Sequence, residues 1–204
     1  MALGFKDKFN LEKQVTFYLS YHSDPINKAL HLVCIWPILL SAIYLLNTTT
    51  PFIAGALDPS HYFVVNAALV GVIIYALWYM VLDPIAGTFC AGLIVAFYTW
   101  SNHFIYESVT KTGESHWQVA LIIHVTAWII QFIGHGVFEK RAPALLESWD
   151  QAIITAPLFV ALELILPLGY RREMHERVER NVAINVAKFR QQRDAASTKP
   201  LVGK

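Results

Sequence analysis

Eight histidines are the residues of this sequence best suited to chemistry, and two of them flank a short polar segment near the amino terminus. His22 lies in the segment Tyr21–Pro25, and His31 follows nine residues later, near the start of a long apolar run. On one continuous helix, nine residues at 100° per residue would place the two imidazoles on opposite sides. Pro25 disfavours helical geometry at Asp24, so the chain can bend there and bring both imidazoles to a joint metal site.

A second group of polar residues lies on the last long apolar run before residue 139. His124, Gln131 and His135 fall on a narrow helical face, because eleven residues return to within about 20° of the starting direction. Glu139 continues that face one turn later. His135 and Glu139 therefore offer an imidazole and a carboxylate at the end of the bundle where the first two histidines lie. Three imidazoles and a carboxylate would suit iron.

The remaining histidines divide into candidates and anchors. His103, near the end of another apolar run, is a further candidate ligand. His124 lies near the middle of its span, where a polar group is costly unless it has a function, and it is expected to support the ligands through hydrogen bonds. His61, His116 and His175 are interpreted as interfacial anchors or helix contacts. The sequence lacks the H-x-x-x-H and H-x-x-H-H boxes of di-iron membrane desaturases, and it lacks a Gly-rich phosphate loop. Those two classes of enzyme are therefore disfavoured.

The composition indicates which elements must position these residues. Of the chain's 204 residues, 55% are hydrophobic and 15% are charged, against about a quarter charged in soluble domains. Four long runs contain no Asp, Glu, Lys or Arg: Ala29–Leu57, Pro59–Leu82, Pro84–Tyr106 and Ser115–Phe138. A helix needs roughly 20 apolar residues to cross a bilayer. A buried bundle in a soluble protein is the alternative, but four such runs in one short chain favour a membrane protein.

The distribution of cations predicts the topology. Residues 1–28 contain four Lys or Arg, the chain from Arg171 onward contains nine, and residues 48–61 contain none. Because cations favour the cytoplasmic side, both termini are predicted to face the cytoplasm, with 1–204 as one membrane domain, 29–170 as its bundle and 171–204 as a cytoplasmic tail. The four predicted spans are Ala29–Leu46, Tyr62–Leu82, Pro84–Tyr106 and Trp117–Phe138.

A fifth apolar run, Gln151–Tyr170, differs from the other four. Pro157, Glu163 and Pro167 interrupt it, and a full crossing would carry the cationic tail to the wrong side. It is therefore predicted to be re-entrant or interfacial and to pack against the bundle. The tail beyond it has apolar residues at near-fourfold spacing, which predicts an amphipathic helix either on the membrane surface or against a partner. The predicted fold class is an all-α integral membrane protein with four transmembrane helices.

Three blocks of this sequence carry a resemblance to a known family: Tyr21–His31, Trp128–Leu145 and Ala156–Glu163. Together they resemble the Mpo-type 2-hydroxy fatty acid dioxygenases of fungi, over roughly residues 10 to 175. The resemblance implies an enzyme of the endoplasmic reticulum membrane that performs an Fe(II)-dependent α-oxidation. Its substrates would be molecular oxygen and a 2-hydroxy long-chain fatty acid, which would be shortened by one carbon in phytosphingosine breakdown.

The resemblance carries over three site residues, His22, His31 and His135, which would hold the iron. The positions of further residues add expected roles, and Glu139, one turn after His135, would take part in catalysis. The substrate would contact Gln131 and be attracted through its carboxylate by Lys140 or Arg141, although these two cations could equally serve to set the topology. The expected supporting residues are Asp24, His124 and Glu163. A 2-hydroxy acid can chelate ferrous iron through its carboxylate and hydroxyl, provided that the protein ligands leave positions open.

Two alternatives from other classes remain open. A non-enzymatic lipid-binding scaffold or transporter would use the histidines structurally and bind no metal. A metal-dependent lipid hydrolase would use the same imidazoles and need no oxygen. The net charge of +1 gives no sign of a nucleic-acid partner, whereas membrane lipid is an expected partner.

Overall fold

The computed structural model describes residues 4–53, 59–142 and 151–197, and this part of the chain is helical without strands. Pro143–Leu145, at the end of one resemblance block, lie outside the described residues. The elements are η1 (Phe5–Phe9), α1 (Leu11–Tyr21), α2 (Pro25–Asn47), α3 (Ala67–Leu82), α4 (Pro84–Thr112), α5 (Trp117–Ile133), η2 (Gly134–Glu139), η4 (Gln151–Thr155), α6 (Ala156–Ile165) and α7 (Arg172–Ser197).

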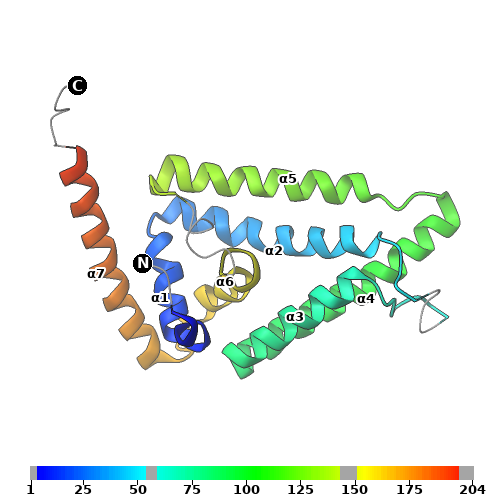
Figure 1. Cartoon of the computed structure of the whole chain (residues 1–204), viewed down its shortest axis with the longest axis horizontal. Helices are drawn as coiled ribbons and strands as arrows, with labels where there is room; N and C mark the ends of the chain where they lie inside the picture. The colour runs from blue at the N-terminus through cyan, green and yellow to red at the C-terminus, as the bar shows by residue number, and fades with distance from the viewer. Residues whose placement is uncertain (1–3, 54–58, 143–150, 198–204) are drawn as a thin grey trace.

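Two antiparallel helix pairs make up the long part of the molecule (Figure 1). α2 lies along α5, and α3 lies along α4. α1 and α7 lie side by side at one end of these pairs, and α6 lies near the same end, so both termini are found there (Figure 1). The amino-terminal end of α2, the carboxyl-terminal end of α5 and α1 therefore meet in one region of the molecule.

Two Asp-Pro pairs start the helices that matter most for this arrangement. The Asp24 carboxylate caps α2 by accepting from the backbone N–H groups of Ile26 and Asn27, at 2.8 and 3.1 Å, with Pro25 in the first turn. Asp83 and Pro84 repeat this arrangement at the start of α4. Aspartate at the cap and proline in the first turn are both favoured at a helix start, so each pair ends one helix and begins the next.

Asp83 has a second role, because its side chain also connects the α3–α4 turn to the segment before α7. Its buried carboxylate accepts from the Tyr170 hydroxyl at 2.7 Å and from the Arg171 Nε at 2.9 Å. Burial by itself would raise the pKa of this carboxyl, but the hydrogen bonds from Tyr170 and Arg171 hold the pKa below its ordinary value. Asp83 therefore stays ionised and keeps α7 attached to the bundle.

Three helical segments are long and apolar enough to cross a membrane: Pro25–Asn47, Pro84–Thr112 and Trp117–Glu139. Large apolar side chains on these segments and on α3 point outward, among them Leu77, Phe89 and Ile122, which are 57%, 68% and 65% exposed. Water would oppose such exposure, whereas lipid favours it. The fold is thus an all-α protein with the character of a membrane protein.

The second predicted span differs most from the structure. It was expected to begin at Tyr62, but α3 begins at Ala67 and has 16 residues. Asn66 ends the preceding extended segment because its side chain caps α3 at the Leu69 N–H, at 3.1 Å. Length and composition therefore indicate three spanning helices in the described residues, and α3 is a shorter apolar helix.

The fifth apolar run packs against the bundle, as predicted. It forms the π-helical turn η4 followed by the short helix α6, with Leu158 and Leu162 fully buried. The Trp78 Nε1 donates to Thr155 Oγ1 at 3.0 Å and the Tyr79 hydroxyl donates to the Ile154 carbonyl at 2.9 Å, which fixes η4 to α3. The prediction of an interrupted, packed segment is confirmed.

The amphipathic tail helix is also confirmed, and it packs on this chain's own α1. Arg177 pairs with Glu12 at 2.9 Å, and the Asn185 side chain donates to Ser20 Oγ at 3.0 Å. Val178 on the apolar face of α7 is fully buried. α7 therefore supports α1, the helix that ends at His22.

Candidate metal centre

His22, His31 and His135 come together from three elements. His22 lies at the carboxyl end of α1, His31 lies on α2, and His135 lies in η2. Their ring centroids are 4.3, 4.9 and 4.8 Å apart in pairs, and one ligand nitrogen of each lies within 4.8 Å of the others. All three side chains are buried. The predicted bend at Asp24–Pro25 is what allows the first two to meet.

The hydrogen bonds of two of these imidazoles determine which nitrogen is free. The Nδ1 of His22 lies 2.7 Å from the Tyr18 carbonyl, and the Nδ1 of His31 lies 2.8 Å from the Asn27 carbonyl. A carbonyl can only accept, so both Nδ1 atoms must carry the proton and both Nε2 atoms keep their lone pairs. This pattern, with Nδ1 held by the backbone, is the usual support for a histidine that binds a metal through Nε2.

The third imidazole and the local electrostatics fit the same chemistry. The buried Nδ1 of His135 has no hydrogen-bond partner among the described residues. Burial, followed by repulsion from the other two imidazoles, lowers the pKa of His22 well below its ordinary value, so this ring is neutral. Neutral imidazoles with free lone pairs are the form that binds a transition metal. The residues present therefore fit a metal ion.

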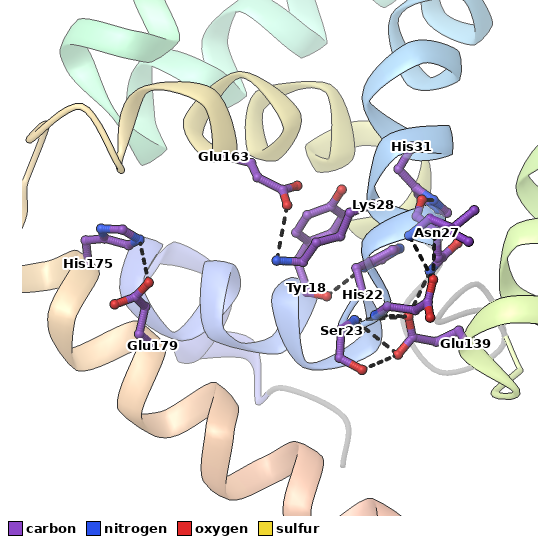
Figure 2. A network of polar contacts seen from close by, with 12 residues as sticks. Tyr18, His22, Ser23, Asn27, Lys28, His31, Glu139, Glu163, His175 and Glu179 are labelled. Carbon is purple, nitrogen blue, oxygen red and sulfur yellow. Dashed lines mark hydrogen bonds and ion pairs between the residues drawn. The ribbon is translucent and has the colours of Figure 1, made fainter.

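Glu139 holds the turn that connects the first two histidines. Its carboxylate accepts from the Ser23 backbone N–H at 3.0 Å, the Ser23 hydroxyl at 2.5 Å, the Asp24 N–H at 2.9 Å and the Asn27 side-chain amide at 3.1 Å. Figure 2 shows these contacts between Glu139 and the segment around Ser23. The backbone carbonyl of Asn27 also bonds His31, and Ser23 directly follows His22. Glu139 therefore positions these two histidines indirectly, by holding the backbone to which they belong. We call these contacts the Glu139 latch.

Gly134 allows α2 and the end of α5 to approach closely enough for this arrangement. A Cβ at this position would lie 2.4 Å from Asn27 Oδ1, which is closer than side-chain carbons come in proteins. The chain after Gly134 is π-helical, and such wider turns occur frequently at functional sites. A small residue followed by a π-helical turn thus brings His135 and Glu139 against the first turn of α2.

An elongated, mostly apolar cavity of about 290 Å³ leads away from the three imidazoles. It follows α2 from His31 to Ala42, a rise of about 16 Å, between α5 on one side and η4 with α6 on the other. Most of its walls are aliphatic or aromatic, and its polar residues include Tyr18, Gln131 and Gln151. A cavity of this shape suits a long acyl chain whose polar end lies at the histidines.

Gln131, predicted to contact the substrate, and His124, predicted to support the ligands, both line this cavity. Both polar atoms of the buried Gln131 side chain lack a partner among the described residues, so its amide is available to a ligand. His124 lies further along, where its Nε2 accepts from Trp128 at 3.1 Å and its Nδ1 contacts Ser41 Oγ at 3.0 Å. With both nitrogens engaged, His124 forms part of the wall.

Other predicted residues lie around the site or far from it. Asp24 caps α2, and Glu163 on α6 pairs with Lys28 at 3.4 Å. His103 does not reach the cluster, because α4 carries it to the opposite end, where its Nδ1 bonds the Ser60 carbonyl at 2.6 Å. Its location gives no support to a role as a ligand of this cluster.

The two predicted substrate cations face different surroundings. Lys140 is exposed just after η2. The Arg141 guanidinium lies 3.4 Å from the centre of the Tyr21 ring and 4.3 Å from that of Phe189, and it donates to the Ser20 carbonyl at 2.8 Å. Arg141 therefore joins α1 to α7, and its contacts give no support to a role in attracting the substrate carboxylate.

Comparison with known proteins decides the family. Residues 9–167 match the family described as 2-hydroxy-palmitic acid dioxygenase Mpo1-like. The chain belongs to this family. It is 30% identical, over 90% of its own length and 96% of the relative's, to a Saccharomyces cerevisiae protein called 2-hydroxy-palmitic acid dioxygenase MPO1. No solved structure matches the chain significantly. Membership in the Mpo1-like family agrees with the resemblance found in the sequence.

Three residues that shape this Mpo1-like site are not among those predicted from the sequence: Tyr18, Asn27 and Gln151. Tyr18 and Asn27 each precede a histidine ligand candidate by four residues on the same helix, and their carbonyls orient those histidines. This spacing was a signal that could have been used, since the fourth residue back lies one turn below. Gln151 lies far away in the sequence and gave no comparable signal.

Proposed function

We propose that this protein is an Fe(II)-dependent dioxygenase that converts a 2-hydroxy long-chain fatty acid into the fatty acid with one carbon fewer, in the breakdown of phytosphingosine. The observation that carries the proposal is the group of three buried imidazoles, two with Nε2 lone pairs left free, at one end of an apolar cavity. The Saccharomyces cerevisiae relative is named as a dioxygenase of 2-hydroxy-palmitic acid, which supports the same substrate class.

Bound iron would supply a Lewis-acidic centre at which the 2-hydroxy acid and oxygen react. His22, His31 and His135 would hold it, and Glu139 would keep the first two in place. The apolar walls along α2 and α5 would bind the acyl chain and exclude water, and the free Gln131 amide would bind the polar end. One hydroxy acid and one O2 can give the shortened acid, carbon dioxide and water, so the reaction balances without another reductant.

The proposal is tested with purified protein, 2-hydroxypalmitate and palmitate. The hydroxy acid should disappear and the acid with one carbon fewer should appear only when both Fe(II) and oxygen are present. Palmitate should not react, because it lacks the hydroxyl that completes a chelate with the metal. Mass spectrometry of the products, with and without oxygen, measures this. Equal consumption of palmitate would contradict the chelation mechanism.

The same experiment separates the two alternatives. A metal-dependent lipid hydrolase would form product under strict anaerobiosis, and it would act on an ester or amide bond. A scaffold or transporter would show no turnover and would not retain stoichiometric metal. The cluster of three ligand-type imidazoles favours an enzyme over a scaffold, because a structural role does not require two lone pairs to be left free in a buried site.

We further propose that the protein lies in the endoplasmic reticulum membrane with four crossings and both termini in the cytoplasm. The support is that α3 runs back along the molecule after α2, and α5 runs back after α4. The turn between α3 and α4, the carboxyl end of α5, and α7 therefore lie at the same end as the amino terminus (Figure 1). The metal site would then lie near the cytoplasmic surface. In sealed microsomes, protease added outside should digest α7, and protection of α7 would contradict the topology.

A further inference from the structure

Tyr18 is a polar residue of the cavity to which the proposed function gives no chemical role. Its side chain is 5% exposed, it lines the cavity, and its hydroxyl oxygen has no hydrogen-bond partner among the described residues. A buried hydroxyl without a partner loses its bonds to water and gains nothing in return. Such a group is unusual in a folded protein unless it has a ligand to bind.

The ring of Tyr18 is held firmly, so its hydroxyl has a defined place. It stacks on His22 with 4.2 Å between ring centroids and an angle of 29°, and it contacts Phe159 of α6 at 5.1 Å. Figure 2 shows Tyr18 between Glu163 and His22. The hydroxyl therefore belongs to the polar end of the cavity, beside the imidazole cluster.

The Tyr18 hydroxyl has a proton available to donate. A phenolic O–H can donate one hydrogen bond, and the buried Tyr18 oxygen makes none with the described residues. Lys28 pairs with one Glu163 oxygen, and the other has no partner among the described residues, so a Tyr18–Glu163 hydrogen bond is the competing use of this proton.

We infer that the Tyr18 hydroxyl is a substrate-binding group that donates a hydrogen bond to the carboxylate of the 2-hydroxy fatty acid. The inference rests on the proposed function, since it needs that substrate in the cavity. Gln131 faces the same cavity from α5 with a free amide, so α1 and α5 would each supply one polar contact to the acid's head group. A neutral donor is suitable there, because a second cation beside a metal would compete with it. Tyr18 would thereby help to select a free carboxylate over an ester.

The test is Tyr18→Phe, which removes one oxygen and keeps the ring that stacks on His22 and the carbonyl that orients it. A hydrogen bond to a charged group corresponds to roughly a 10- to 100-fold change in affinity. The dissociation constant for 2-hydroxypalmitate should therefore rise by that factor. For its methyl ester, which carries no charge, the loss of affinity should be smaller than for the acid, at about 2- to 10-fold or less. The iron content per chain should equal that of the wild type.

Tyr98→Phe is the matched control. The Tyr98 hydroxyl donates to the Val64 carbonyl at 2.5 Å near the opposite end of the molecule, so its loss affects stability without touching the cavity. This variant should bind the acid as the wild type does. If the wild type neither binds nor consumes 2-hydroxypalmitate, the proposed function itself fails.

If the wild type is active, three results would overturn the assignment of Tyr18 alone. Unchanged affinity in Tyr18→Phe would mean that the hydroxyl serves Glu163. An equal loss for acid and ester would mean that Tyr18 contacts the acyl chain. Loss of iron from the variant would mean that Tyr18 acts only as packing beneath His22.

Discussion

Replacing His135 by alanine should remove the metal and abolish turnover. Loss of one of three protein ligands weakens metal binding severely, given that changes to residues that merely support ligands cost about 10- to 100-fold. We expect the rate of 2-hydroxypalmitate consumption to fall by a factor on the order of a thousand or more. Elemental analysis of the purified variant should find iron well below one atom per chain. His22→Ala and His31→Ala should give the same result.

His135 is the best position for this test because its Nδ1 has no partner among the described residues. Its removal therefore costs packing but leaves no backbone carbonyl unpaired, unlike removal of His22 or His31. His175→Ala is the control, since His175 lies on α7 and pairs with Glu179 of the same helix at 3.4 Å. That variant should keep its iron and its rate. Full activity of His135→Ala would exclude the metal centre described here.

The parts of this molecule that depend on local pattern were predicted from the sequence. The uncharged runs predicted the approximate positions of α2, α4 and α5. The thickness of the hydrocarbon layer sets both the length of a spanning helix and its apolar composition, so such helices can be recognised from the sequence. The bend at Asp24–Pro25 and the packed, interrupted segment after residue 150 followed from the geometry of proline. The three histidines were grouped correctly because each lies at an end of an element facing the same side.

The parts that depend on contacts distant in the sequence were not predicted. The sequence predicts that Arg141 either attracts the substrate or sets the topology, but nothing in the local sequence encodes its contacts with Tyr21 of α1 and Phe189 of α7. The span predicted from Tyr62 rests on the uncharged run Pro59–Leu82, whereas the cap formed by the Asn66 side chain decides where α3 begins. Tyr18 was not predicted either, because its role depends on two features that the local sequence does not show. Its side chain is buried, and its hydroxyl has no hydrogen-bond partner among the described residues.

The second large effect should come from Glu139, a residue predicted from the sequence to act in catalysis. In the structure its carboxylate accepts four hydrogen bonds from Ser23, Asp24 and Asn27. Hydrogen bonds to charged groups contribute about 1.5–3 kcal/mol each, and the segment they hold carries both His22 and His31. Glu139→Gln keeps the size of the side chain but replaces one accepting oxygen by an amide NH2 group. That group would face the donors of Ser23, Asp24 or Asn27 and could not accept from them. We expect iron affinity to fall about 10- to 100-fold, with a similar loss of activity at limiting iron.

A second variant distinguishes the Glu139 latch from direct binding of the metal by Glu139. Ser23→Ala removes the hydroxyl that donates to Glu139 at 2.5 Å and touches none of the three imidazoles. If the latch is correct, Ser23→Ala alone should weaken iron binding several-fold. The double variant Ser23→Ala/Glu139→Gln should bind iron about as well as Glu139→Gln alone, because the effects of two residues that act through one contact are not additive. If Glu139 binds the metal itself, Ser23→Ala should leave iron affinity unchanged while Glu139→Gln abolishes it. Glu176→Gln, which alters an exposed carboxylate on α7 paired with Arg172 at 3.2 Å, should change neither measurement.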